Sequence, residues 1–167
     1  MDTQTTHNTL TNFQKVQEFN ESFGMTRHQT YQRQIFTENP NLVNLRLSLI
    51  TEEVGELTDA IKEHDFIEVR DALADILYVV YGMADALGIN ADDDYAIVHR
   101  SNMSKLCNSE EEAIRTVENY QKKYESCESP YDSPYYTYLE KIGKWVVKNK
   151  STGKVLKSIN YTQVQFD

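Results

Sequence analysis

The stretch 71–89, DALADILYVVYGMADALGI, constrains the fold of this chain more than any other segment. It is apolar on almost every side, which predicts a helix that is buried on most of its faces. Asp75 nevertheless lies in its middle, and Asp71 lies one turn earlier. An ionised carboxylate in apolar surroundings is costly unless a cation or a hydrogen-bond network compensates it. These two acids therefore need partners.

A second acid cluster in apolar surroundings lies about twenty residues upstream, in the segment LITEEVGEL. Its members are Glu52, Glu53 and Glu56. Apolar residues at spacings of three and four over 43–61 predict a long helix that starts at an Asn41 cap and ends near His64. At about 100° per residue, the three glutamates fall within an arc of roughly 100°. We therefore expect them on a partly buried edge of this helix.

The link between these two helices is short, so we expect an antiparallel hairpin. Asp65 is the predicted N-cap of the second helix, and Gly88 is its predicted C-cap. The two acid clusters can then meet and hold a divalent metal ion. A site of four or five carboxylates without cysteine or histidine suits Mg²⁺, Mn²⁺ or Ca²⁺, although the loop pattern of a dedicated Ca²⁺ site is absent. Open carboxylate–Mg²⁺ sites usually bind phosphates.

The rest of the chain is predicted to be mostly helical. Further helices are expected at 10–23, 90–106 and 109–125, and the segment 25–40 is either a short helix or a loop. Four residues of this segment are candidates to contact a ligand: Arg27, His28, Tyr31 and Arg33. The simpler interpretation is that they belong to a connecting segment exposed to solvent. The Ser, Pro and Asp content of 126–138 predicts a loop. Two β-prone runs, 145–147 and 155–156, flank a Ser-Thr-Gly turn and predict a small hairpin.

Length and charge limit the class of protein. A chain of 167 residues is expected to form one domain, 1–167, with a core at about 10–107 and an extension at 108–167. The net charge of −9 disfavours a nucleic-acid polymer as partner. Cys107 and Cys127 lack metal-site spacing, and no secretory signal is visible, which favours reduced thiols in the cytoplasm. The stretch 71–89 is too short and too acidic to span a membrane.

These motifs resemble a known superfamily. The order Glu52-Glu53-x-x-Glu56, followed by an acid pair that ends at Asp75 within ADILYVVYG, is similar to the all-α nucleoside triphosphate pyrophosphatases. That superfamily includes MazG-like enzymes, dimeric dUTPases, dCTP pyrophosphatases and phosphoribosyl-ATP pyrophosphohydrolase. The segments HRSNMSK at 99–105 and GKVLK at 153–157 resemble a MazG-like branch described as phosphoribosyl-ATP pyrophosphohydrolase-like. The resemblance covers about 10–107 well and the tail loosely.

One departure concerns the second acid cluster. The superfamily usually has an ExxD motif there, but Ala72 stands three residues before Asp75. Asp71 stands four residues before it and takes the glutamate role with a displacement of one residue. In another register, Glu68-x-x-Asp71 fills the motif instead. We favour Asp75 as the aligned aspartate because ADILYVVYG fits around it.

The resemblance implies a MazG-like helical bundle completed by oligomerisation, as a homodimer or homotetramer. It also implies Mg²⁺-dependent hydrolysis of a nucleoside triphosphate, NTP or dNTP, between the α and β phosphates. Glu53 would orient or deprotonate the attacking water. The implied metal ligands are Glu52, Glu53, Glu56, Asp71 and Asp75. The implied contacts to phosphates or sugar are Arg100, Asn102, Lys105, Lys154 and Lys157.

Three functions stay open at this point. Extra segments around the shared bundle favour a house-cleaning role in the nucleotide pool. The second function is hydrolysis of phosphoribosyl-ATP in histidine biosynthesis. The third is a non-catalytic helical oligomer whose acids form a structural metal site, which predicts no pyrophosphate release from any nucleotide.

Overall fold

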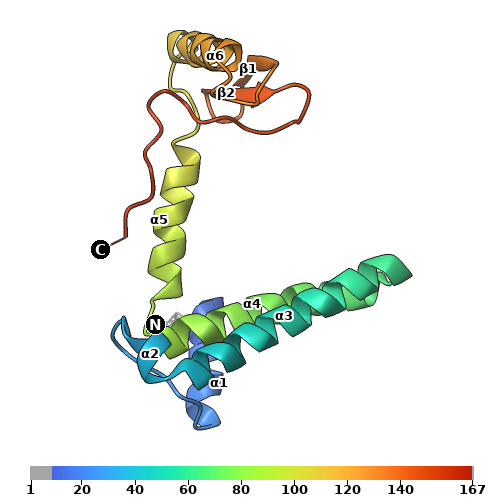
Figure 1. Ribbon diagram of the computed structural model, residues 1–167, viewed down its shortest axis with the longest axis vertical. Coiled ribbons are helices and arrows are strands. Elements are labelled where there is room, and N and C mark those ends of the chain that lie inside the picture. The colour runs from blue at the N-terminus through green and yellow to red at the C-terminus, as the bar shows by residue number, and fades with distance from the viewer. Residues whose placement is uncertain (1–8, 167) are drawn as a thin grey trace, which may run out of the picture. The chain divides into compact units, whose positions relative to one another are not determined.

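A computed structural model describes residues 9–166 of the chain. The chain forms six helices and two strands in these residues (Figure 1). In order, they are α1 Asn12–Ser22, α2 Ile35–Glu38, α3 Pro40–Glu63, α4 Phe66–Leu87, α5 Ala91–Met103, α6 Glu110–Glu125, β1 Pro134–Leu139 and β2 Lys144–Asn149. The mostly helical fold with one small antiparallel sheet confirms that part of the prediction. The chain divides into two compact units, one ending at Asp94 and one starting at Tyr95, which are described separately.

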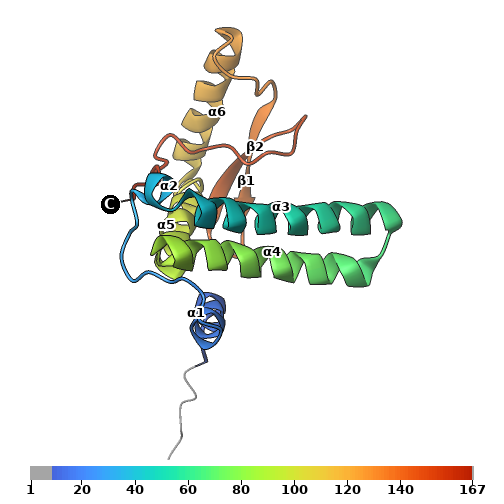
Figure 2. The same ribbon diagram turned by 60° about the horizontal axis from the view of Figure 1, so that its bottom comes forward.

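The first unit is built on the hairpin of α3 and α4, which lie side by side and antiparallel in both ribbon views (Figures 1 and 2). His64 adopts a left-handed conformation between the two helices, with φ of 58°. The Asp65 side chain accepts the N–H groups of Ile67 and Glu68, which confirms the predicted N-cap. The predicted C-cap is also confirmed, because Gly88 ends α4 with φ of 70°.

The predicted cap at the start of α3 was wrong by two residues. Asn39, rather than Asn41, accepts the N–H of Leu42 through its side-chain oxygen. Pro40 then occupies the first helical position. Proline suits that position because its fixed φ is already helical and its missing N–H would have had no partner there. The helix therefore begins before the apolar stripe that was used to predict it.

α1 and the segment after it cover the C-terminal half of α4. Phe13 and Val16 of α1 are buried, and the Phe13 ring lies 5.9 Å from the Tyr81 ring between centroids. The following segment is fastened to the end of α4, where His28 N–H donates to the Asp85 carbonyl and Gln32 N–H donates to the Leu87 carbonyl. α1 and this segment therefore leave the hairpin end near His64 uncovered.

Gly88 is required by this close approach, so Gly88→Ala is expected to be strongly destabilising. A Cβ there would stand 1.9 Å from the backbone oxygen of Thr30, and φ is +70°. Strain and displacement together should lower the free energy of unfolding by about 3 kcal/mol, measured by urea denaturation. Gly24→Ala is the matched control, because Gly24 has φ of +65° with nothing within 4 Å and should lose only about 1 kcal/mol. Equal losses in the two variants would contradict the role of the Thr30 contact.

The second unit contains the small sheet, and here the predicted hairpin was wrong in its partner. β2 pairs antiparallel with β1, so that Tyr136 faces Val147 and Tyr138 faces Trp145. The run around Val155 makes only a single bridge, to Lys148. The segment predicted as a loop contains the missing strand, because its tyrosines and threonine favour an extended chain that packs on one face. The sheet packs with α6 around a buried core of Cys107, Ala113, Val147 and Leu156.

The tail of the second unit is held by side-chain hydrogen bonds. The Ser158 hydroxyl donates to the buried Glu112 carboxylate, and Thr162 N–H donates to Ser104 Oγ at 2.9 Å. Burial acts to raise the pKa of Glu112, but the hydrogen bonds from Ser158, Asn108 N–H and Asn160, together with the charge of Lys144, outweigh it and hold the pKa below its usual 4.5. Glu112 is therefore a charged anchor for the tail.

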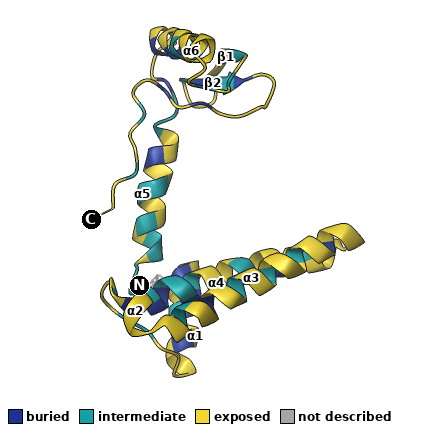
Figure 3. Cartoon of the chain, in the orientation of Figure 1, coloured by how far each residue is buried: buried dark blue, intermediate teal, exposed yellow. Residues whose placement is uncertain are grey.

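The hairpin leaves much of its apolar surface uncovered within one chain (Figure 3). The prediction that 71–89 is buried on most faces does not hold for the single chain, since Leu73 is 49% exposed and Leu77 is 52% exposed. The other large exposed apolar side chains of α3 and α4 include Leu45, Leu47, Val54, Ile61, Phe66, Ile67 and Val80. Within residues 9–166 no single helix is long and apolar enough to cross a membrane, and only α4 and α5 taken together pass by length and composition.

Candidate metal and nucleotide site

The seam between α3 and α4 brings the two acid clusters together. Arg46 lies against Gly82, because a Cβ at Gly82 would stand 2.9 Å from Arg46 Nη1. Glu53 lies seven residues after Arg46, and Asp75 lies seven residues before Gly82. Seven residues are about two helical turns, and the two helices are antiparallel. Two turns forward from Arg46 along α3 and two turns back from Gly82 along α4 therefore lead to the same level, which places Glu53 opposite Asp75.

The charges around Glu53 show the same convergence. Burial raises the pKa of the Glu53 carboxyl above its usual 4.5, and four neighbouring carboxylates raise it further. In order of effect these are Glu56, Asp75, Glu52 and Asp71. The four other acids that the sequence predicted as metal ligands therefore all lie close enough to Glu53 for their charges to act on it. Glu53 and Asp75 are half-buried, whereas the other three side chains are exposed.

A hard divalent cation fits this donor set. The Oε2 atom of Glu53 is buried and has no hydrogen-bond partner. All the donors are carboxylate oxygens, which Mg²⁺ prefers. Among residues 9–166, no three histidine, cysteine, aspartate or glutamate side chains stand in an arrangement that could already hold a metal. A bound cation would therefore have to draw the exposed acids inward.

The alternative acid Glu68 lies elsewhere in α4. It belongs to the first turn of the helix, where its N–H donates to the Asp65 side chain at 3.1 Å. Asp71, in contrast, is one of the groups whose charge raises the pKa of Glu53. This difference favours Asp71 as the displaced second acid of the motif.

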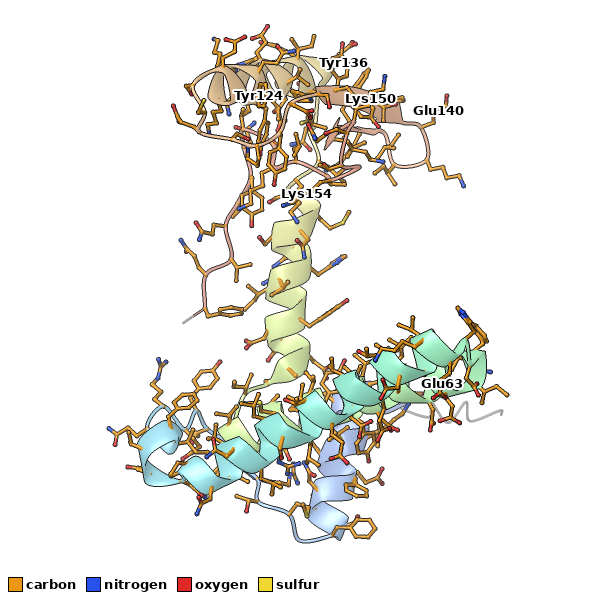
Figure 4. The ribbon with its side chains drawn as sticks, turned by 45° about the vertical axis from the view of Figure 1, so that its right-hand side comes forward. Glu63, Tyr124, Tyr136, Glu140, Lys150 and Lys154 are labelled. Carbon is orange, nitrogen blue, oxygen red and sulfur yellow. The ribbon has the colours of Figure 1, made fainter. Side chains whose placement is uncertain are left out.

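The predicted substrate contacts belong to the second unit. Lys105 Nζ donates to Asn102 Oδ1 at 2.7 Å, so these two side chains lie together, and Arg100 is exposed on α5. Lys154, labelled in Figure 4, lies 5.2 Å from the centre of the Tyr131 ring, and Lys157 lies over Tyr161 at 4.4 Å. Their approach to the acids of the first unit stays a prediction.

The sequence pattern does not single out Arg46, although the residue is 6% exposed and its Nε and Nη2 atoms are buried without a hydrogen-bond partner. The one signal that could have found it is its position, two helical turns before Glu53 on the same face of α3. Its guanidinium is accommodated because Gly82 has no side chain.

The structure also assigns a structural role to two candidates from the segment 25–40. Arg27 Nε donates to the buried carboxylate of Asp85 at 2.9 Å, and Arg27 Nη1 donates to Glu21 at 2.8 Å. The Nδ1 atom of His28 lies 2.6 Å from the Ala86 carbonyl oxygen. An open pocket of about 600 Å³ adjoins these residues at the C-terminal end of α4. It is lined by Gly88 and Ile89, which lie more than three helical turns beyond Asp75.

A helical hairpin that gathers four carboxylates around a half-buried glutamate places this protein in the MazG-like, all-α nucleoside triphosphate pyrophosphatase superfamily. A model of the phosphoribosyl-ATP pyrophosphohydrolase family matches residues 16–102, which are 87 of the 167 residues and include all five acids. The chain is also similar to an uncharacterized protein of Acanthamoeba polyphaga mimivirus, with 32% identity over 233 residues, covering 89% of this chain and 91% of the relative. The chain belongs to the phosphoribosyl-ATP pyrophosphohydrolase family. Membership supports the hydrolysis of a phosphoric anhydride bond in a nucleotide-like substrate.

Proposed function

We propose that this protein hydrolyses a nucleoside triphosphate between its α and β phosphates and releases a nucleoside monophosphate and pyrophosphate. The observation that supports this most is the state of Glu53. Its carboxylate is half-buried, one of its oxygens has no partner, and four other carboxylates raise its pKa. Crowded negative charge of this kind is compensated by a cation, and a cation held by carboxylates binds phosphates.

Mg²⁺, or Mn²⁺ in its place, is the cofactor that we propose. The side chains that would hold it are those of Glu52, Glu53, Glu56, Asp71 and Asp75. When bound, the metal supplies neutralisation of phosphate charge and polarisation at phosphorus. Glu53 also orients the attacking water and accepts its proton. Its raised pKa brings the carboxylate closer to the basicity that a general base needs near neutral pH.

The second unit supplies the positive charge in this proposal. Lys105 and Asn102, which already form a hydrogen bond, would contact a phosphate or the sugar of the substrate. Arg100, Lys154 and Lys157 would offset phosphate charge. Residues 134–166 carry six lysines and a single acid, Glu140, in a chain whose net charge is −9. This concentration of positive charge supports a contact with a polyanionic substrate.

We further propose that the protein works as a homodimer or homotetramer. The support is the exposed apolar surface of α3 and α4, where Phe66 is 74% exposed and Ile67 is 72% exposed. So many exposed large apolar side chains on one helical hairpin are typical of an interface. A second copy of the same hairpin offers a complementary surface by symmetry.

Phosphoribosyl-ATP is the second candidate substrate, because the matching family model carries that description. A screen for pyrophosphate release with Mg²⁺ over all NTPs, all dNTPs and phosphoribosyl-ATP tests both candidates. We expect release from at least one nucleoside triphosphate, with the monophosphate as the other product. Release from phosphoribosyl-ATP alone would favour the biosynthetic role. No release from any compound would contradict both and favour a structural metal site.

A further inference from the structure

We propose that the rings of Phe19, Phe23 and Tyr78 form a stacking platform for the base of the substrate nucleotide. The inference rests on the proposed function and extends it to the part of the substrate that the acids do not reach. Phe19 meets Tyr78 edge-on, with centroids 5.5 Å apart and an interplanar angle of 84°. Phe23 lies against Phe19, with centroids 4.4 Å apart and an angle of 31°.

The platform is next to the candidate metal site along α4. Tyr78 follows Asp75 by three residues and Asp71 by seven, so the three side chains share one stripe of the helix. Three residues correspond to a rise of about 4.5 Å. In a nucleotide only the ribose separates the α phosphate from the base. A substrate whose phosphates lie at Asp75 therefore carries its base within reach of Tyr78 and the two phenylalanines.

The rings are exposed although they are packed together. Phe23 is 68% exposed, Phe19 is 40% exposed and Tyr78 is 39% exposed. The Phe23 N–H donates to the Phe19 carbonyl at 3.0 Å, so Phe23 closes the end of α1 one turn after Phe19, and the two rings are already in contact without a ligand. A preformed aromatic surface is the usual means of binding a nucleobase by its flat face.

Stacking of this kind contributes affinity without reading the hydrogen-bonding edge of the base, because every base has a π face. The three rings carry one polar group between them, the Tyr78 hydroxyl. The platform should therefore bind the bases of several nucleoside triphosphates. Its loss should raise KM for nucleotides and leave kcat almost unchanged, because the rings do not contact the reacting phosphates.

The test is Phe23→Ala, assayed with the best nucleoside triphosphate from the screen. We expect KM to rise about tenfold, which corresponds to about 1.4 kcal/mol, with kcat within twofold of wild type. Inorganic triphosphate has no base, so its inhibition constant should not change. Phe23→Trp should retain the wild-type KM. Phe36→Ala is the matched control, because Phe36 is 62% exposed on α2 and should leave KM unchanged.

Calorimetric titration with the same nucleotide, with Ca²⁺ replacing Mg²⁺, gives a readout that does not depend on turnover. The dissociation constant should rise about tenfold for Phe23→Ala and remain constant for Phe36→Ala. An unchanged KM, or an equal effect on inorganic triphosphate, would overturn the platform while the enzyme stays active. A smaller oligomer for Phe23→Ala would assign the rings to a second copy of this chain and would also overturn it. A wild-type protein that releases no pyrophosphate would overturn the proposed function and the platform together.

Discussion

Glu53→Gln is expected to lower the rate of pyrophosphate release by at least about a hundredfold. The glutamine keeps the shape of the side chain, but it cannot accept a proton from water and it binds a cation weakly. The rate is measured with the best nucleoside triphosphate from the screen. Glu63→Gln is the matched control, because Glu63 is an exposed acid in the last turn of the same helix (Figure 4) and should retain wild-type activity.

The same variant has a second expected outcome, in stability. The pKa of Glu53 in the folded protein lies above its usual 4.5, so the folded state binds the proton more tightly than the unfolded state. Without metal, stability therefore falls as pH rises from 4.5 through the folded pKa. At neutral pH, Glu53→Gln removes this repulsion and should resist urea as well as or better than wild type. Added Mg²⁺ should stabilise it less than wild type. A less stable variant that keeps full activity would refute the role of Glu53.

Asp85→Ala is expected to lower the free energy of unfolding by about 3 kcal/mol, measured by urea denaturation. Asp85 is 1% exposed and accepts hydrogen bonds from Gln17 at 3.1 Å, Asn20 at 2.8 Å and Arg27 at 2.9 Å. The carboxylate thus joins α1, the segment after α1 and α4. Its removal leaves Asn20, which is 2% exposed, without this partner, and leaves the Arg27 charge without its buried counter-ion.

The control for Asp85 is an acid that also forms an ion pair but lies in solvent. Asp59 contacts Lys62 at 2.7 Å, and the two side chains are 70% and 67% exposed. Asp59→Ala should change the free energy of unfolding by no more than about 0.5 kcal/mol, because solvent screens exposed pairs. Similar losses for Asp85→Ala and Asp59→Ala would show that the buried network does not hold α1 in place.

The hairpin and its acids could be predicted because their signals are local. Apolar spacing of three and four, the Asp65 cap and Gly88 each act within a few residues, and the structure confirms the two helices, the Asp65 cap and the Gly88 cap, although not the expected burial of 71–89. The convergence of Glu53 with the other acids follows from that hairpin once the link is short. β1 was missed for the opposite reason. Its tyrosines become a strand only because β2 and α6 cover one face, and those partners are distant in sequence.

Residues whose role depends on distant neighbours could not be predicted in the same way. Arg46 has the pattern of an ordinary helix residue, and only the absence of a side chain at Gly82 lets its guanidinium enter the seam. The spacing of Phe19 predicts that it belongs to the buried apolar stripe of α1. In the structure it is 40% exposed, and its ring contacts Tyr78. Sequence spacing gives the face of one helix but not the face of its neighbour.

The hydrogen bond between Ser104 and Thr162 has an evolutionary consequence. Ser104 follows α5 directly, and Thr162 lies next to it. Residues 105–161 therefore form a segment whose two ends are adjacent in space. A segment with adjacent ends can gain insertions, suffer deletions or be replaced as a unit without a change in the path of the remaining chain. The alignment with the mimivirus protein runs over 233 residues, against 167 in this chain. A segment with adjacent ends, such as 105–161, is where related proteins can differ in length by whole helices or strands.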